Sequence, residues 1–169
     1  MDKTTREVWN IMDMNGKIPW SAVSDFHDPQ YSFLSNFYEV PVTYRGLTFG
    51  SNEAAFQAQK CLNEEVKRQF TEYSPAKSKG IGRRVNLRPD WEEVKNGVMY
   101  EIVLAKFTQH PELAEKLLAT GEKVLVEGNT WHDVYWGVDT RTGEGENHLG
   151  KILMRVRTEL ATQSETIRF

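Results

Sequence analysis

Apolar residues recur at helical spacing in three stretches of this chain, and each stretch predicts a helix. The first covers residues 91–107, directly after the Pro89-Asp90 break. The second opens with Pro111 and closes with Gly121, and the third is an amphipathic pattern near the end of the chain. The apolar positions are Trp91, Val94, Val98, Ile102 and Ala105 in the first stretch, Leu113, Leu117 and Leu118 in the second, and Leu149, Ile152, Leu153, Val156 and Leu160 in the third.

A shorter stretch, residues 49–61, combines a helix start with a line of polar side chains. Ser51 or Asn52 is suited to cap a helix there. Glu53 would then lie in the first turn, where the positive end of the helix dipole favours a charged carboxylate that can act as a fixed anion or a base. The alternative is that this carboxylate is ordinary first-turn helix chemistry. Helical spacing puts Glu53, Gln57 and Lys60 on one face, and the small residues Ala54, Ala58 and Cys61 with Leu62 on another.

The strand signals are short and few. Residues 40–49 alternate weakly between apolar and polar side chains and contain Arg45-Gly46, which predicts a hairpin that leads into the helix of residues 49–61. Residues 123–127 are a second strand candidate. The elements together predict an α+β fold, a mainly helical single domain with a small β-sheet.

Residues 31–38 are rich in aromatic side chains with polar side chains between them. They form either a buried strand or edge loop, or a pocket in which Asn36 and an aromatic face such as Phe37 hold a flat ring. The second interpretation makes Asn36 and Phe37 candidate substrate-binding residues.

Four cations surround two glycines in the segment of residues 76–84, which follows the helix-start signal Ser74-Pro75. The segment lacks the third glycine and the preceding strand of a dinucleotide-binding loop or P-loop. Nearby glycines allow close backbone approach, and Lys77 and Arg83 supply charge, so a phosphate site is one interpretation. A solvated charged face is the other.

The loop of residues 128–137 carries two Trp, one Tyr, one His and one Asp. A loop with so many large and ionisable side chains is more often functional than a plain connector. We therefore consider Asp133, Trp136 and Gly137 as candidate site residues. The alternative is an aromatic plug over the core, with Asp133 as a turn or cap residue.

Size and charge narrow the class of protein. The chain has 169 residues, a formal net charge of -3 and a single Cys. The charge implies no strong global attraction to nucleic acid, so any polyanion would need a local basic patch. No Cys/His spacing resembles a zinc site, and no segment resembles a membrane span or a signal peptide. We expect a cytoplasmic protein with an unassigned extension at residues 1–25, a domain at 26–160 and a frayed tail at 161–169.

Several short motifs, taken together, resemble the YbiA/NADAR family over residues 31–160. In order, they are Phe33-Leu34-Ser35-Asn36-Phe37, Ser51-x-Glu53-x-x-Phe56-Gln57-Ala58-Gln59-Lys60, Gly82-Arg83, Trp91, Lys106-Phe107, the Trp131 to Gly137 loop and Asn147-x-Leu149-Gly150. The resemblance implies one α+β domain that acts as an N-glycosidase without a metal or cofactor. Glu53, Trp91 and Asp133 occupy the matching active-site positions.

Cleavage of a ribosyl C1'–N bond passes through a cation-like transition state, so the site needs an anion and a means of activating water. Glu53 suits that task, Asp133 is the candidate second carboxylate, Lys77 and Arg83 would hold phosphate, and Trp91 or a loop aromatic would stack on a ring. Two carboxylates permit inversion or retention.

The resemblance implies two classes of substrate. The first is ADP-ribosylated guanine in nucleic acid such as DNA, with a cognate ADP-ribosyltransferase toxin as partner and this chain as antitoxin. The second is a phosphoribosylamino-pyrimidine intermediate of riboflavin biosynthesis. A binding module that holds ADP-ribose or NAD without cleaving it is the rival from another class.

Overall fold

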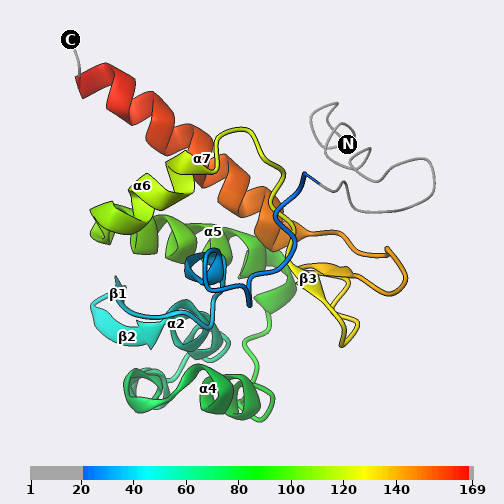
Figure 1. The fold of residues 1–169 in the computed structure, drawn as a ribbon. Coiled ribbons are helices and arrows are strands. Elements are labelled where there is room, and N and C mark those ends of the chain that lie inside the picture. Colours follow the sequence, from blue (N-terminus) through cyan, green and yellow to red (C-terminus); the bar gives the residue numbers. More distant parts are fainter. Residues whose placement is uncertain (1–20, 168–169) are drawn as a thin grey trace. The chain divides into compact units, whose positions relative to one another are not determined.

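The computed structural model describes residues 21–167 (Figure 1). Most of the expected N-terminal extension, and residues 168–169 of the expected tail, lie outside the described part. The described chain forms two compact units, one with the residues up to Leu34 and from Lys116 onward, the other Ser35–Glu115. The predicted class, α+β and mainly helical with little sheet, is confirmed, since residues 21–167 contain six helices and two two-stranded sheets.

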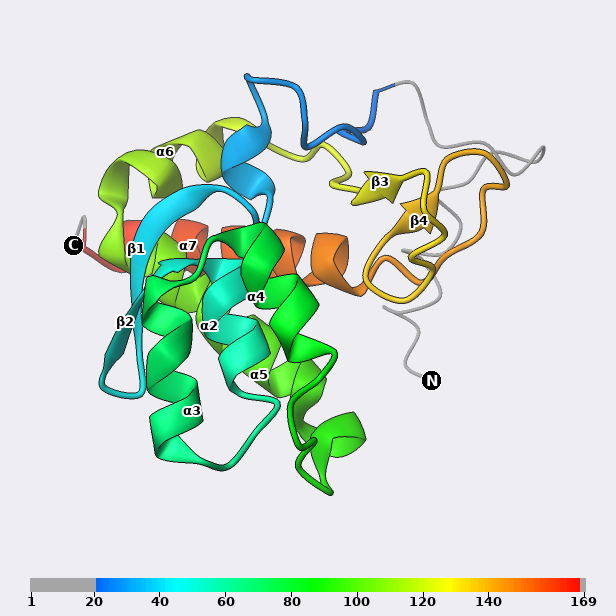
Figure 2. The ribbon, with the colours of Figure 1, turned by 90° about the horizontal axis from the view of Figure 1, so that it is seen from below.

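The unit of Ser35–Glu115 is organised around one short helix, α2 (Asn52–Ala58), of which every residue is buried. This helix contacts the hairpin strands and the neighbouring helices, and Figure 2 shows it between the hairpin and α4. The surrounding elements are β1 (Glu39–Tyr44), β2 (Leu47–Ser51), α3 (Glu64–Gln69), the 3-10 turn η2 (Phe70–Glu72), α4 (Pro75–Gly82) and α5 (Trp91–Gln109). The next helix, α6 (Pro111–Ala119), begins in this unit and ends in the other.

The hairpin forms where the sequence predicts it. β1 and β2 pair antiparallel, with Tyr44 opposite Leu47. The two residues between them, Arg45 and Gly46, have φ angles of 49° and 82°, as a two-residue hairpin turn requires. The hairpin therefore delivers the chain directly to the start of α2.

Two serine caps fix the starts of the two helices that matter most for the site. Ser51 Oγ accepts a hydrogen bond from the Ala54 amide at 3.1 Å, and Ser74 Oγ accepts one from the Lys77 amide at 3.2 Å. Both caps match the sequence prediction. Each one satisfies an amide that the first helical turn leaves without an intrahelical partner.

α2 is shorter than its small-residue pattern predicts. It ends at Ala58, and Asn63 caps the next helix by accepting from the amides of Glu65 and Val66. Cys61 is buried but lies outside α2, whereas Leu62 is 59% exposed. The predicted stripe that includes Cys61 and Leu62 is therefore wrong beyond Ala58, because a second capping residue restarts the helix there.

Burial of Lys106 on α5 has an electrostatic cost that the sequence pattern does not reveal. The side chain is 1% exposed, and its Nζ donates a hydrogen bond to the Ser35 carbonyl at 3.1 Å. The rings of Tyr38 and Phe107 lie 5.3 and 5.4 Å from Nζ. Burial lowers the pKa of Lys106 from 10.5 to about 7, because the charged form loses its hydration.

This shift predicts that stability rises with pH above neutrality. Between pH 7 and 10.5 the unfolded chain binds a proton at Lys106 that the folded chain does not, so the free energy of unfolding increases with pH. Urea denaturation between pH 7.5 and 9.5 should give a slope for Lys106→Met that is lower than the wild-type slope by roughly 1 kcal/mol per pH unit. The exposed Lys123 provides the control, since Lys123→Met should leave the slope unchanged. Equal slopes for wild type and Lys106→Met would contradict the prediction.

The other unit holds the turn η1 (Ser32–Leu34), the parallel pair of β3 (Gly128–Asn129) and β4 (Val138–Asp139), and α7 (His148–Ile167). The predicted strand at residues 123–127 is wrong, because that segment makes only an isolated bridge between Leu125 and Val23. α7 buries its predicted apolar face, but it continues to Ile167, past the expected start of fraying at Ala161. None of the helices in residues 21–167 has the length and apolar character needed to cross a membrane.

Candidate functional site

Glu53 lies in the first turn of α2, one residue after the helix begins. It is 8% exposed, and its amide donates a hydrogen bond to the Asn36 carbonyl at 3.0 Å. The positive end of the helix dipole compensates part of the cost of burying a carboxylate at this position. The structure therefore holds the candidate anion in a fixed and largely dry place.

The Glu53 carboxylate has a defined neighbour on its own helix. Gln57 lies one turn later, 6% exposed, and its Nε2 donates to Glu53 Oε1 at 2.9 Å. The predicted polar face of α2 is thus present as a hydrogen-bonded pair. A carboxylate held in this way has fewer rotamers available than a solvated one.

Lys60, just beyond the end of α2, interacts electrostatically with several other charged side chains. Burial lowers the pKa of Lys60, and the negative charge of Glu53 acts in the opposite direction. Three other cations add to the lowering, which places them within electrostatic reach of Lys60: Arg83, Lys79 and Lys95. Like charges within electrostatic reach of one side chain favour a bound anion. The site thus combines a carboxylate with a region suited to phosphate.

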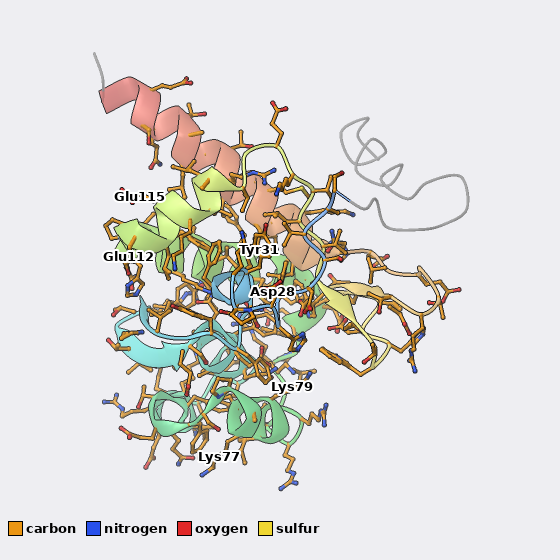
Figure 3. All side chains as sticks on the ribbon, in the orientation of Figure 1. Asp28, Tyr31, Lys77, Lys79, Glu112 and Glu115 are labelled. Carbon is orange, nitrogen blue, oxygen red and sulfur yellow. The ribbon has the colours of Figure 1, made fainter. Side chains whose placement is uncertain are left out.

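The structure separates Lys77 and Arg83, the two cations that the sequence predicts to bind phosphate. Arg83 is one of the cations that act on Lys60. Lys79, one turn earlier on α4, is another. Lys77 is exposed and lies with its Nζ 4.4 Å from the centre of the Tyr73 ring. Figure 3 shows Lys77 and Lys79 on different sides of α4. Sequence reasoning missed Lys79, although i, i+4 spacing from Arg83 was the available signal.

The two glycines of this segment do not form a phosphate-binding loop. Gly80 and Gly82 both lie inside α4. A Cβ at Gly80 would meet nothing within 4 Å, but a Cβ at Gly82 would lie 2.0 Å from Gln57 Oε1. The close approach that Gly82 permits is therefore between two helices, α4 and α2.

Asn36 and Phe37 occupy the middle of a turn, not a strand. The Tyr38 amide donates to the Ser35 carbonyl at 3.2 Å and closes the turn. Asn36 is 9% exposed and touches Glu53 through its backbone, whereas Phe37 is 43% exposed, with its ring 5.8 Å from Lys79 Nζ. The turn thus presents an open aromatic ring next to the cations.

Trp91 is the first residue of α5, and its side chain is buried. It is 5% exposed, and its ring lies 5.0 Å from the Phe56 ring of α2. Just before it, Arg88 pairs with Asp90 at 2.6 and 2.9 Å, which secures the entry into α5. The structure supports a packing role for Trp91, and its predicted catalytic role stays a prediction.

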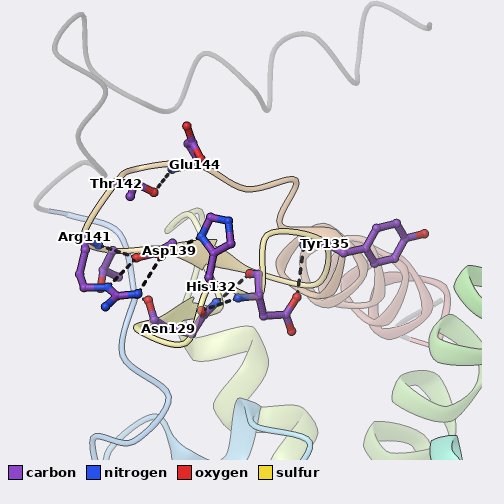
Figure 4. A network of polar contacts seen from close by, with 9 residues as sticks. Asn129, His132, Tyr135, Asp139, Arg141, Thr142 and Glu144 are labelled. Atoms are coloured by element: carbon purple, nitrogen blue, oxygen red, sulfur yellow. Dashed lines mark hydrogen bonds and ion pairs between the residues drawn. The ribbon is translucent and has the colours of Figure 1, made fainter. Parts of the chain in front are cut away.

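Asp133 belongs to the other unit, where it shapes the loop of residues 128–137. Its Oδ1 accepts hydrogen bonds from the amides of Tyr135 and Trp136 at 3.2 and 3.0 Å. The Asn129 side chain holds the Asp133 backbone on both sides, with 2.9 Å bonds to its carbonyl and amide (Figure 4). One carboxylate oxygen thus has the turn role that was the alternative from sequence.

Trp136 and Gly137 lie in the same loop. The Trp136 ring is 4.9 Å from that of Tyr135, which in turn lies 4.4 Å from the His148 ring. Gly137 is buried, and a Cβ there would come within 2.1 Å of the Glu127 carbonyl. This glycine permits the backbone approach on which the β3 and β4 pairing depends.

Sequence reasoning missed a buried carboxylate on β4, just after this loop. Asp139 is 1% exposed, and the Arg141 guanidinium together with the His132 ring holds its pKa well below the usual range. His132 has a φ of 62°, and its Nδ1 lies 3.0 Å from Asp139 Oδ2 (Figure 4). This cluster fixes the loop that carries Asp133. Within residues 21–167, no three His, Cys, Asp or Glu side chains are grouped so that they could hold a metal ion.

Comparison with known proteins adds the family. Residues 24–161 match the family model described as "NADAR domain", which spans both compact units. N-glycosidase YbiA of Escherichia coli is 42% identical over 136 residues, which cover 79% of this chain and 84% of that protein. N-glycosidase Npun_R5314 of Nostoc punctiforme is 35% identical over 136 residues, 77% of this chain and 86% of that protein.

Two further matches extend the comparison. Riboflavin biosynthesis protein VVA0006 of Vibrio vulnificus is 40% identical over 139 residues, which cover 79% of this chain but only 36% of that longer protein. The NMR structure of Escherichia coli YbiA superposes with a TM-score of 0.74 at 34% identity and covers 90% of this chain and 93% of that one. The predicted fold thus agrees with a solved structure of a relative.

Proposed function

We propose, from the premise that this chain belongs to the NADAR family and is an N-glycosidase, that Glu53 supplies the anion for hydrolysis of a ribosyl C1'–N bond. The observation that carries the proposal is a carboxylate, 8% exposed, within electrostatic reach of Lys60, on which three other cations also act. An N-glycosidase cleaves its ligand, so this function differs from the rival class, a module that binds ADP-ribose without cleaving it.

Each group in this region has a task that suits its chemistry. The developing positive charge on the ribose is stabilised by the carboxylate of Glu53, which also directs the attacking water. The substrate phosphate binds to Lys79 and Arg83, each of which can donate charge-assisted hydrogen bonds to it. The exposed ring of Phe37 stacks on the base.

Asp133, Trp136 and Gly137 enter the proposal as the contribution of the loop of residues 128–137. One oxygen of Asp133 holds the turn, and in this proposal the other orients water or a ribose hydroxyl. Two catalytic carboxylates permit either inversion or retention of the anomeric configuration.

The substrate we propose first is guanine that carries ADP-ribose in nucleic acid, with this chain as antitoxin to a DNA ADP-ribosyltransferase. The pyrophosphate of ADP-ribose is an anion that Lys60 and the cations within its electrostatic reach suit. The names of the Vibrio vulnificus relative and of a Zea mays relative, riboflavin biosynthesis protein PYRR, favour a phosphoribosylamino-pyrimidine as the second candidate. Both substrates present a phosphate, a ribose and a C–N bond.

Mass spectrometry of the products tests the proposal. Wild type and Glu53→Gln are incubated separately with an oligonucleotide that carries ADP-ribosylated guanine and with a phosphoribosylamino-pyrimidine. Free ADP-ribose and restored guanine from wild type alone would support the first substrate, and a released sugar phosphate the second. A folded wild type that cleaves neither compound would refute both substrates.

The phosphate assignment makes a separate prediction about the two sides of α4. Lys79→Ala and Arg83→Ala should each raise KM by roughly tenfold or more, because each removes a charge-assisted hydrogen bond to the phosphate. Lys77→Ala is the matched control on the same helix and should leave KM within about twofold, since Lys77 lies over the Tyr73 ring. An equal increase for Lys77→Ala would favour the original sequence-based assignment.

A further inference from the structure

The amide of Gln57 is held between a candidate catalytic group and a glycine. Its Nε2 donates to Glu53 Oε1 at 2.9 Å, and its Oε1 lies against Gly82, where a Cβ would come within 2.0 Å of the oxygen and 2.7 Å of Cδ. The opposite orientation of the amide would place two oxygens against each other at Glu53. The hydrogen bond therefore defines which end faces the carboxylate.

Gly82 also lies between the cations of α4. Lys79 comes three residues before it, and Arg83 follows it as the C-cap of the helix. Ser78, one turn before Gly82, is fully buried. The face of α4 that meets Gln57 thus carries small residues, while the neighbouring positions carry the charges that reach Lys60.

We propose that Gln57 is a positioning residue for the reaction: it orients the Glu53 carboxylate, and Gly82 provides the space that keeps its amide in that orientation. The inference rests on the proposed function, because it assigns a role toward Glu53 as the catalytic anion. One contact thereby sets the geometry of the carboxylate relative to α4, the helix that carries the phosphate-binding cations. The Gly-x-Gly pattern then reflects helix packing at its second glycine and has no role in a phosphate loop.

The contact at Gly82 predicts a loss of function with little loss of stability. A methyl group at position 82 meets the far end of a flexible side chain, so the Gln57 amide can move aside and the fold can remain. The amide would then no longer donate to Glu53. Because an interaction that only places a reacting group acts on the chemical step, kcat should fall while KM stays constant.

The experiment compares Gly82→Ala with Gly80→Ala, a control in the same helix where a Cβ meets nothing within 4 Å. Gln57→Met removes the donor but keeps the length of the side chain. Gly82→Ala and Gln57→Met should each lower kcat by about tenfold with KM within twofold, and Gly80→Ala should change neither. The double variant Gln57→Met/Gly82→Ala should lose no more kcat than Gln57→Met alone, since both changes remove the same bond.

Other outcomes overturn the inference. An unchanged kcat for Gln57→Met would overturn the inference even if Gly82→Ala fails to fold. A raised KM with unchanged kcat for Gly82→Ala would mean that Gly82 acts through the cations. Equal losses for Gly80→Ala and Gly82→Ala would point to a general disturbance of α4. Full activity of Glu53→Gln would refute the proposed function and this inference together, whereas an inactive Glu53→Gln with active Gln57 and Gly82 variants would refute only the inference.

Discussion

Glu53→Gln should lower kcat by about 10³-fold, because the variant can neither stabilise a ribosyl cation nor accept a proton from water. The amide has the shape of the carboxylate and can still accept the hydrogen bond from Gln57. We therefore expect the free energy of unfolding to stay within about 1 kcal/mol of wild type, the scale of a lost charge–dipole interaction at a helix start. Steady-state kinetics and urea denaturation of the same preparations measure both quantities.

A second first-turn glutamate provides the matched control for this prediction. Glu65 on α3 has the same position relative to a helix start but is exposed. Glu65→Gln should leave kcat unchanged and lower the free energy of unfolding by no more than about 1 kcal/mol, as expected for Glu53→Gln. If Glu53→Gln behaved like Glu65→Gln, the Glu53 carboxylate would have only the ordinary role of a first-turn acid.

Local signals in the sequence predicted much of the fold. The caps at Ser51 and Ser74 and the turn at Arg45-Gly46 depend on a few neighbouring residues, and the structure confirms them. The long helices α5 and α7 follow from their apolar spacing alone. The strand prediction for residues 123–127 was wrong because a strand forms only where a distant segment pairs with it. Here the pairing is a single bridge.

The site was less accessible to sequence reasoning, because its geometry depends on contacts between helices. The charge cluster of residues 77–84 gave no reason to prefer Lys79 over Lys77 until the phase of α4 was known. Gly82 signalled a close approach, but the sequence could not tell that the neighbour was the Gln57 amide and not a phosphate. Asp139 went unnoticed because its importance comes from burial and from Arg141 and His132, none of which a pattern of residue types reveals.

Trp91→Ala should destabilise the protein by about 3–5 kcal/mol, because it empties a space that a buried indole ring fills. The ring packs on Phe56, which lies on α2 three residues after Glu53, so the loss would loosen α2 against α5. Trp91→Phe should recover most of the stability, since an aromatic ring can still meet Phe56. Urea denaturation of the two variants measures these differences.

The two Trp91 variants also separate packing from chemistry. A decrease of less than about 1 kcal/mol in the free energy of unfolding of Trp91→Ala would mean that the ring contributes little packing and is available to stack on a substrate ring. If Trp91→Phe is stable but loses kcat, the indole contacts the substrate in addition to Phe56. A stable Trp91→Phe with wild-type kcat would confine Trp91 to packing and leave Glu53, held by Gln57 on one side and Asn36 on the other, as the centre of the site.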